Sequence, residues 1–274
     1  MTSGVKTWRD YHQGPWGQVH IRHAAPTDGI RSETALVLFH ESPLSSRVWE
    51  RMLPISGQYR QVLAPDTPGY GLSDPPEAAG REIPEYAAAI LSALLEAGVE
   101  DMVVVGVHTG ASIAIEIAQQ SDRVRGVVLC GVALLTPEER AEYLANWTPP
   151  IPVTSNGDQF DWALKRYHRI WGEDTPAWML NLAIGDVLSI TDRYHWGYQA
   201  AFRYDPEPAL RVLKQPTLLL DAEFDLLAAN DPLVQAMVSN CRTTIIPGLR
   251  GQLPMRVPEI TARELEEFTR AHAN

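Results

Sequence analysis

A short apolar run that ends in two glycines, four positions apart, constrains this chain more than any other feature. Residues 102–105 are apolar, the turn Gly106–Gly110 holds His108 at its centre, and an amphipathic helical pattern follows. Glycines at both ends of such a turn let a strand and a helix approach closely and lift the central side chain away from the backbone. The sequence therefore predicts a strand–turn–helix unit that presents His108 to a pocket.

Short apolar segments alternate with helical patterns along most of the chain. Strands that are apolar throughout are typical of a parallel sheet covered on both faces. Their alternation with helices favours a doubly wound α/β fold with a mostly parallel sheet. The expected strands are 18–23, 35–39, 60–64, 102–106, 126–130, 217–220 and 243–246, and the expected helices are 84–97, 110–120, 232–239 and 258–271.

Between Gly131 and Leu213 this alternation stops, and helical segments follow one another without a convincing strand. We predict a helical cap, residues 135–205, inserted into a core made of residues 1–134 and 206–274. This stretch contains five of the eight tryptophans, so we expect an apolar pocket beneath the cap. The cap residues expected to bind substrate are Trp147, Trp171, Trp178, His195 and Trp196.

Composition excludes several classes of partner. The net charge of −11 argues against nucleic acid and anionic membranes. No apolar stretch approaches the roughly 20 residues that span a bilayer, and Met1–Asp10 lacks the apolar core of a signal peptide. The two cysteines, Cys130 and Cys241, are interpreted as reduced packing residues. We expect a cytoplasmic monomer or homodimer without cofactor, and without a metal site because no His-x₃-His or Cys-x₂-Cys spacing occurs.

Four segments together resemble the cap-bearing branch of the α/β-hydrolase superfamily over about residues 16–271. The resemblance implies an α/β-hydrolase fold with an inserted cap, and an oxyanion hole formed by the backbone N–H groups of Thr109 and Ser42. The segments are 38–46 for the His-Gly-x-Pro loop, 66–73 for the Asp-x-Pro-Gly-x-Gly-x-Ser loop, 106–110 for the nucleophile elbow, and 216–225 for the strand and loop that place Asp225 as the triad acid.

The same segments depart from the family pattern at the catalytic positions. His108 replaces the nucleophilic serine, and Glu41 stands where the oxyanion loop usually has glycine. The turn after the last strand, residues 246–254, holds no histidine, and Gln252 or Gly251 takes its place. Ser112 is one helical turn further on and is expected to face away. A Ser-His-Asp relay therefore cannot be assembled, and Gln252 is expected to contact the substrate instead.

The remaining groups suit acid/base chemistry. The positive end of the helix dipole and the oxyanion-hole donors disfavour an imidazolium, so we expect the pKa of His108 to lie below about 6.5. A neutral His108, with Glu41, Asp225 and the oxyanion hole, could abstract a proton next to a carbonyl. This set of groups suits an elimination, isomerisation, decarboxylation, cyclisation or retro-aldol cleavage.

Three hypotheses of function remain open from the sequence. The first is a cofactor-independent lyase, isomerase, decarboxylase or cyclase that uses His108 as acid and base on an apolar carbonyl compound. The second is an atypical hydrolase of esters or C–C bonds, in which His108 activates water or accepts an acyl group. The third is a non-catalytic module that binds a small molecule. Superfamily membership does not choose among them, because one fold hosts many functions.

Overall fold

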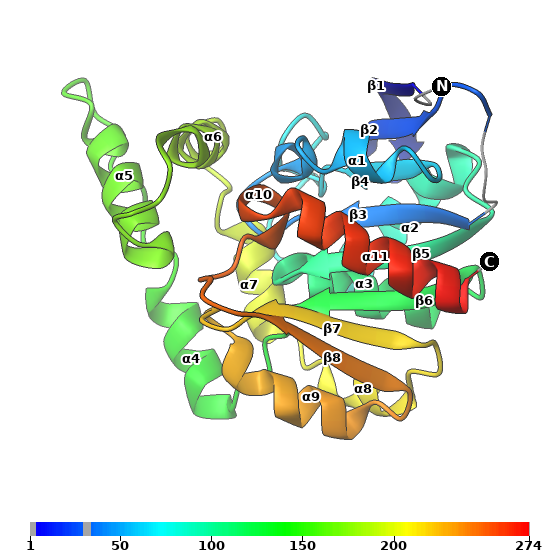
Figure 1. Cartoon of the computed structure of the whole chain (residues 1–274). Coiled ribbons are helices and arrows are strands. Elements are labelled where there is room, and N and C mark those ends of the chain that lie inside the picture. The colour runs from blue at the N-terminus through cyan, green and yellow to red at the C-terminus, as the bar shows by residue number, and fades with distance from the viewer. Residues whose placement is uncertain (1–3, 30–33, 274) are drawn as a thin grey trace.

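The computed structural model describes residues 4–29 and 34–273, and a single sheet runs through the centre of this part of the chain (Figure 1). The sheet has eight strands in the order β1-β2-β4-β3-β5-β6-β7-β8, and β2 alone among them runs antiparallel to its neighbours. The predicted α/β fold with a mostly parallel sheet is therefore confirmed. The strands are β1 (Val5–Gly14), β2 (Gly17–Pro26), β3 (Thr34–Phe39), β4 (Val62–Pro65), β5 (Asp101–Val107), β6 (Val124–Cys130), β7 (Thr217–Ala222) and β8 (Cys241–Ile246).

Among the described strands, β1 is the one that sequence analysis did not identify. It forms a ten-residue antiparallel hairpin with β2 at one edge of the sheet. Most residues of β1 are polar or charged, and its residues are half-buried or exposed up to the final glycine. An edge strand of this kind lacks the continuous apolar run by which the buried strands were found.

Helices cover both faces of the sheet, and each face has its own apolar core. Helices α2, α3, α8 and α9 contribute to the core on one face, and α1, α11 and parts of the cap contribute to the other. The helices of the core domain are α1 (Leu53–Ser56), α2 (Ile83–Glu96), α3 (Thr109–Gln120), α8 (Glu207–Val212), α9 (Asp231–Met237), α10 (Leu253–Arg256) and α11 (Pro258–His272), with short 3-10 turns at Ser46–Trp49 and Ala228–Asn230. None of the described helices is long and apolar enough to cross a bilayer.

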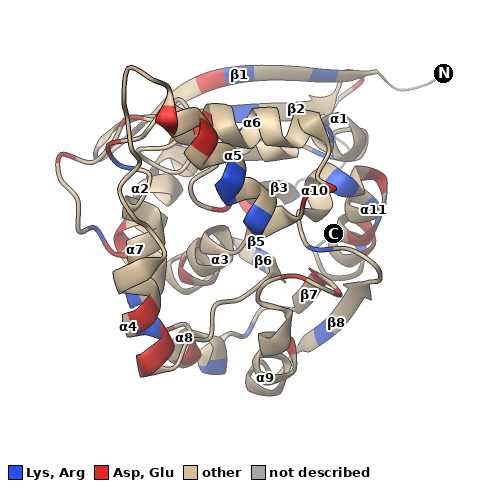
Figure 2. Ribbon diagram, turned by 90° about the vertical axis from the view of Figure 1, so that its left-hand side faces the viewer, with Lys and Arg blue, Asp and Glu red and all other residues tan. Residues whose placement is uncertain are grey.

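Four helices lie between β6 and α8 and fall within the range 135–205 predicted for the cap. They stand to the left of the sheet in Figure 1 and face the viewer in Figure 2. Tyr70, which follows β4, holds the segment around the start of α7 (Trp196–Arg203) against the sheet. Its hydroxyl accepts a hydrogen bond from Gly197 N at 2.6 Å and donates one to Tyr194 O at 3.1 Å. The four are α4 (Pro137–Asn146), α5 (Asp158–Trp171), α6 (Ala177–Leu188) and α7 (Trp196–Arg203).

Candidate active site

His108 occupies the sharp turn between β5 and α3, as the two glycines predict. Its backbone has φ 49° and ψ −108°, a conformation that non-glycine residues rarely adopt, and its N–H donates to Cys130 O at 2.9 Å. A Cβ on Gly106 would lie 2.1 Å from Gly110 O, and a Cβ on Gly110 would lie 2.3 Å from Phe39 O. Both glycines are therefore required by close backbone packing.

The structure brings Glu41, His108 and Asp225 into direct contact. Nδ1 of His108 lies 2.9 Å from Glu41 Oε2, and Nε2 lies 3.0 and 3.1 Å from the two oxygens of Asp225. The three residues follow β3, β5 and β7, whose carboxyl ends meet at one edge of the sheet. Both ring nitrogens of His108 are thus occupied by carboxylates.

Gln252 completes this group from the turn after β8. Its Nε2 donates to Oε1 and Oε2 of Glu41 at 2.8 and 2.9 Å, and both side chains are buried. Gln252 stands at the position where the resemblance would place a relay histidine, with a left-handed backbone at φ 52°. It holds the Glu41 carboxylate against His108, so that Glu41 does not point to solvent.

The expected low pKa of His108 is wrong. Burial disfavours the charged ring, but contacts with Asp225 and Glu41 outweigh it and raise the pKa of His108 well above its ordinary value. Sequence reasoning gave the helix terminus and the backbone donors more weight than carboxylates whose positions were unknown. In the structure those carboxylates touch both nitrogens and favour the protonated ring.

Three aspartates, Asp221, Asp225 and Asp231, lie near Nε2 of His108 or near its partner, and Asp225 is the ionised one that contacts the ring. Burial opposes ionisation of Asp225, but His108 and the Leu227 N–H hold the pKa of Asp225 below its ordinary value. Burial and the charge of Asp225 raise the pKa of Asp221 to about 8 and that of Asp231 to about 6. Asp221 therefore keeps its proton at neutral pH, and Asp225 is the ionised partner of the imidazole.

A pocket opens in front of His108, between the edge of the sheet and the cap. Its empty volume is about 740 Å³, including the mouth. Of the predicted site residues, Glu41, Ser42, His108, Thr109, Trp147, Trp171 and Gln252 line it, whereas Asp225 is not part of its lining and reaches the site through its contact with His108. The other lining side chains are mostly apolar: Pro43, Leu44, Ser112, Ala133, Leu135, Tyr143, Tyr167, Ile170, Tyr198, Ala201, Phe202, Leu226 and Leu227.

Three predicted cap residues do not line this pocket. Trp178 is 39% exposed on the first turn of α6, and its ring lies under the guanidinium of Arg51 at 4.8 Å. His195 and Trp196 are at the start of α7 and contact each other at the edge of their rings. Helix α7 lines the pocket with Tyr198, Ala201 and Phe202, which lie further along the helix. The orientation of α7 therefore decides which of its side chains line the pocket, and tryptophan content does not reveal that orientation.

Sequence reasoning missed four aromatic rings of the pocket: Tyr143, Tyr167, Tyr198 and Phe202. Tyr198, Ala201 and Phe202 follow the i, i+3, i+4 spacing of one helix face, a signal that was available. Ser112 also lines the pocket, contrary to the expectation that it faces away. Its position one turn into α3 places it on the side of the helix that meets the cap.

The oxyanion hole stays a prediction with one supporting feature. Within the described residues, the backbone N–H groups of Thr109 and Ser42 donate to no hydrogen-bond acceptor, although both residues are buried and line the pocket. Buried N–H groups are nearly always paired. Two unpaired donors beside His108 are therefore available to a ligand oxygen.

A model of the alpha/beta hydrolase family matches residues 36–264 of this chain. The protein therefore belongs to the alpha/beta hydrolase family, and its mostly parallel sheet with flanking helices is that of the fold. No curated protein matches the sequence.

Solved structures share the fold at low sequence identity. The chain is similar to an enol-lactonase from Burkholderia xenovorans LB400, with 16% identity, a TM-score of 0.79, and coverage of 95% of this chain and 100% of that one. A hydrolase from Pseudomonas aeruginosa PA01 gives 16% identity, a TM-score of 0.79, and coverage of 95% and 97%. E-2-(Acetamidomethylene)succinate Hydrolase gives 21% identity, a TM-score of 0.77, and coverage of 97% and 100%.

Proposed function

We propose that this protein is a cofactor-independent enzyme that performs acid/base catalysis on an apolar small molecule with a carbonyl group. The observation that supports this most strongly is the contact of His108 with two carboxylates at the elbow of an aromatic pocket. The fold family, whose similar structures include enzymes, supports catalysis in general. The acid/base mechanism rests on the residues of this chain.

Each residue of the group has a separate role in this proposal. Asp225 orients the ring of His108 and balances the charge of the imidazolium. Because both ring nitrogens are bonded, a proton reaches His108 from the pocket only through Glu41 or after the contact with Glu41 opens. Glu41, held by Gln252, is therefore the group that takes a proton from the substrate, and His108 stabilises the Glu41 carboxylate between turnovers.

The reaction begins at a carbon next to the substrate carbonyl. Glu41 removes a proton from that carbon, and the electron pair of the C–H bond moves toward the carbonyl oxygen. The N–H groups of Thr109 and Ser42 stabilise the resulting oxyanion, each by about 3 kcal/mol. Return of the proton at another atom gives isomerisation, and loss of a leaving group gives elimination. Both outcomes need no covalent enzyme intermediate.

Hydrolysis is the second candidate, because two similar structures are named as an enol-lactonase and a succinate-derivative hydrolase. In this alternative Glu41 and His108 activate a water molecule, which attacks the carbonyl of an ester, lactone or C–C cleavage substrate. Both candidates use the same residues and the same pocket. They differ in whether an oxygen atom of water enters the product.

One experiment separates these candidates. The purified protein is incubated with a panel of apolar ketones, lactones and esters, in D₂O and separately in H₂¹⁸O, and the products are analysed by mass spectrometry and NMR. Deuterium entry next to the carbonyl, reduced at least ~10²-fold in Glu41→Gln and His108→Ala, supports proton abstraction. Entry of ¹⁸O into the product supports hydrolysis instead.

A matched control keeps the comparison specific. Trp178→Phe changes a cap tryptophan that lies outside the pocket, so its rates should equal those of the wild type. The proposal of catalysis is overturned if ligands bind without turnover or isotope exchange, since that result favours the binding module. The acid/base assignment is overturned if His108→Ala and Glu41→Gln retain near-normal rates.

A further inference from the structure

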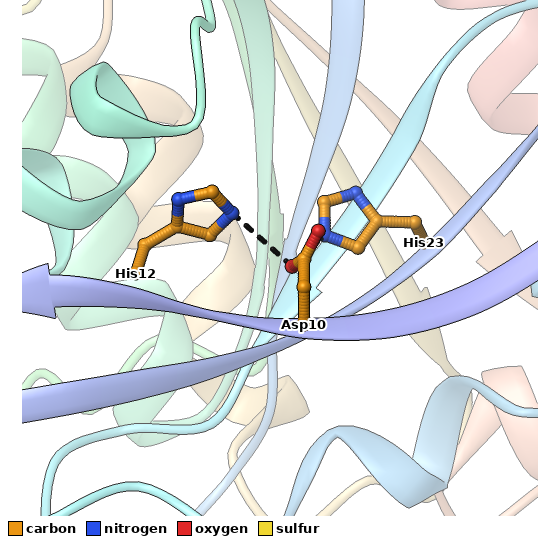
Figure 3. Close-up of side chains that lie close together, drawn as sticks. All are labelled: Asp10, His12 and His23. Carbon is orange, nitrogen blue, oxygen red and sulfur yellow. Dashed lines mark hydrogen bonds and ion pairs between the residues drawn. The ribbon is translucent and has the colours of Figure 1, made fainter.

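A second cluster of titratable side chains lies on the edge hairpin, separate from the pocket. Asp10 and His12 project from the same face of β1, two residues apart, and His23 belongs to the paired strand β2, opposite Trp8 (Figure 3). One ligand atom from each of the three lies within 4.8 Å of the others. Sequence spacing could not reveal this cluster, because its members come from two strands and β1 was not recognised.

Distances within the cluster are close to those between ligands of a metal ion. His12 Nε2 lies 3.2 Å and His23 Nε2 lies 2.6 Å from Asp10 Oδ1. Tetrahedral ligands with bonds of about 2.0–2.1 Å are separated by about 3.3 Å from one another. The first distance already fits this value, and the second requires an opening of several tenths of an ångström.

Two nitrogens of the cluster, His12 Nε2 and His23 Nδ1, are buried and make no hydrogen bond within the described residues. His12 Nε2 has almost no exposed surface, and its ion-pair contact with Asp10 Oδ1 at 3.2 Å lacks hydrogen-bond geometry. A buried polar atom without a partner is costly. A cation between the three side chains would use the lone pair of His12 Nε2 together with those of His23 and Asp10.

The surrounding residues orient these ligands as they do at known metal sites. Nδ1 of His12 lies 3.2 Å from Glu96 Oε2 at the end of α2, and a carboxylate on the second nitrogen is common for metal-bound histidines. Trp8 Nε1 donates to Asp10 Oδ2 at 3.3 Å, which leaves Oδ1 toward the histidines. The Trp8 ring also stacks on His23, with centroids 4.7 Å apart.

From this arrangement we infer that Asp10, His12 and His23 form a binding site for a divalent transition-metal ion, with zinc as the best match. Two imidazoles and one carboxylate are a common ligand set for zinc. The side chain of Asp10 is 39% exposed, so water completes the coordination from the solvent side. The ion joins β1 to β2, and Glu96 extends this connection to α2. The site therefore stabilises the edge hairpin and is independent of the proposed catalysis.

The test uses the full chain without an affinity tag, after treatment with a chelator. Zn²⁺ uptake is measured by equilibrium dialysis, and Co²⁺ is added to a second sample to record its visible absorption spectrum. The wild type should bind one ion per chain, and its melting temperature should rise with Zn²⁺. Asp10→Asn, His12→Gln and His23→Gln should lose this uptake, and Glu96→Gln should bind at least about 10-fold more weakly.

His272→Gln is the matched control, because it removes an exposed histidine elsewhere on the surface and should bind like the wild type. His12→Gln decides the result if the buried His23 variant does not fold, since His12 is only half-buried. The inference is overturned if the wild type binds no zinc. It is equally overturned if Asp10→Asn and His12→Gln bind zinc as tightly as the wild type.

Discussion

The charge of His108 should depend strongly on Glu41, and Glu41→Gln tests this directly. The substitution keeps the shape of the side chain and removes one of two carboxylates bonded to the ring, at 2.9 Å. With charge centres roughly 4 Å apart and an effective dielectric constant of about 20, the pair is worth about 4 kcal/mol. At 1.36 kcal/mol per pKa unit this sets an upper limit of about 3 units. We expect the pKa of His108 to fall by about 1–3 units.

The assay is an NMR titration of protein labelled with ¹³C at histidine Cε1, in which His108→Gln identifies the signal of His108. Glu100→Gln is the control, because Glu100 is exposed and precedes β5, whose far end holds His108. Seven strand residues place it roughly 23 Å away, so its removal should leave the titration unchanged. A pKa of His108 that moves by less than about 0.5 units in Glu41→Gln would refute the Glu41 contact as a contributor to the raised value.

Three further predictions follow from the same geometry. The pKa of His108 is raised in the folded state, so the contribution of His108 to stability is complete below the unfolded pKa of about 6.5 and is lost as pH rises through the folded pKa. Urea unfolding should therefore show that the free energy of unfolding falls on the alkaline side, and His108→Gln should flatten that pH dependence. Fluorophosphonate probes should not label the protein, because the elbow holds His108 instead of an activated serine; stoichiometric labelling of any serine, detected by mass spectrometry, would contradict this. Gly110→Ala should destabilise the fold by about 3 kcal/mol or more, because the added Cβ would lie 2.3 Å from Phe39 O. Gly185→Ala is the control and should be neutral or stabilising, because its Cβ has no neighbour closer than 3.9 Å. Chemical denaturation measures the stability of both variants.

Much of the fold and part of the candidate site could be predicted because they depend on local sequence. Apolar runs identify the buried strands, because a buried strand requires apolar residues. Turn glycines identify the elbow at His108, because close backbone approach requires residues without a side chain. The resemblance to the α/β-hydrolase loops indicated the positions of Glu41 and Asp225, which follow β3 and β7 by a few residues. Strand β1 escaped detection, because an edge strand carries no continuous apolar run.

The tertiary structure alone decided how these residues act on one another. Whether Glu41 points to solvent or to His108 depends on Gln252, which lies more than two hundred positions away in the chain. Asp225 and Glu41 together raise the pKa of His108, because an electrostatic interaction depends on distance in space and not on order in the sequence. The orientation of α7 likewise turns Phe202 toward the pocket and leaves Trp196 out of its lining. Sequence therefore determined which groups stand at the edge of the sheet, and packing determined their partners and their charge.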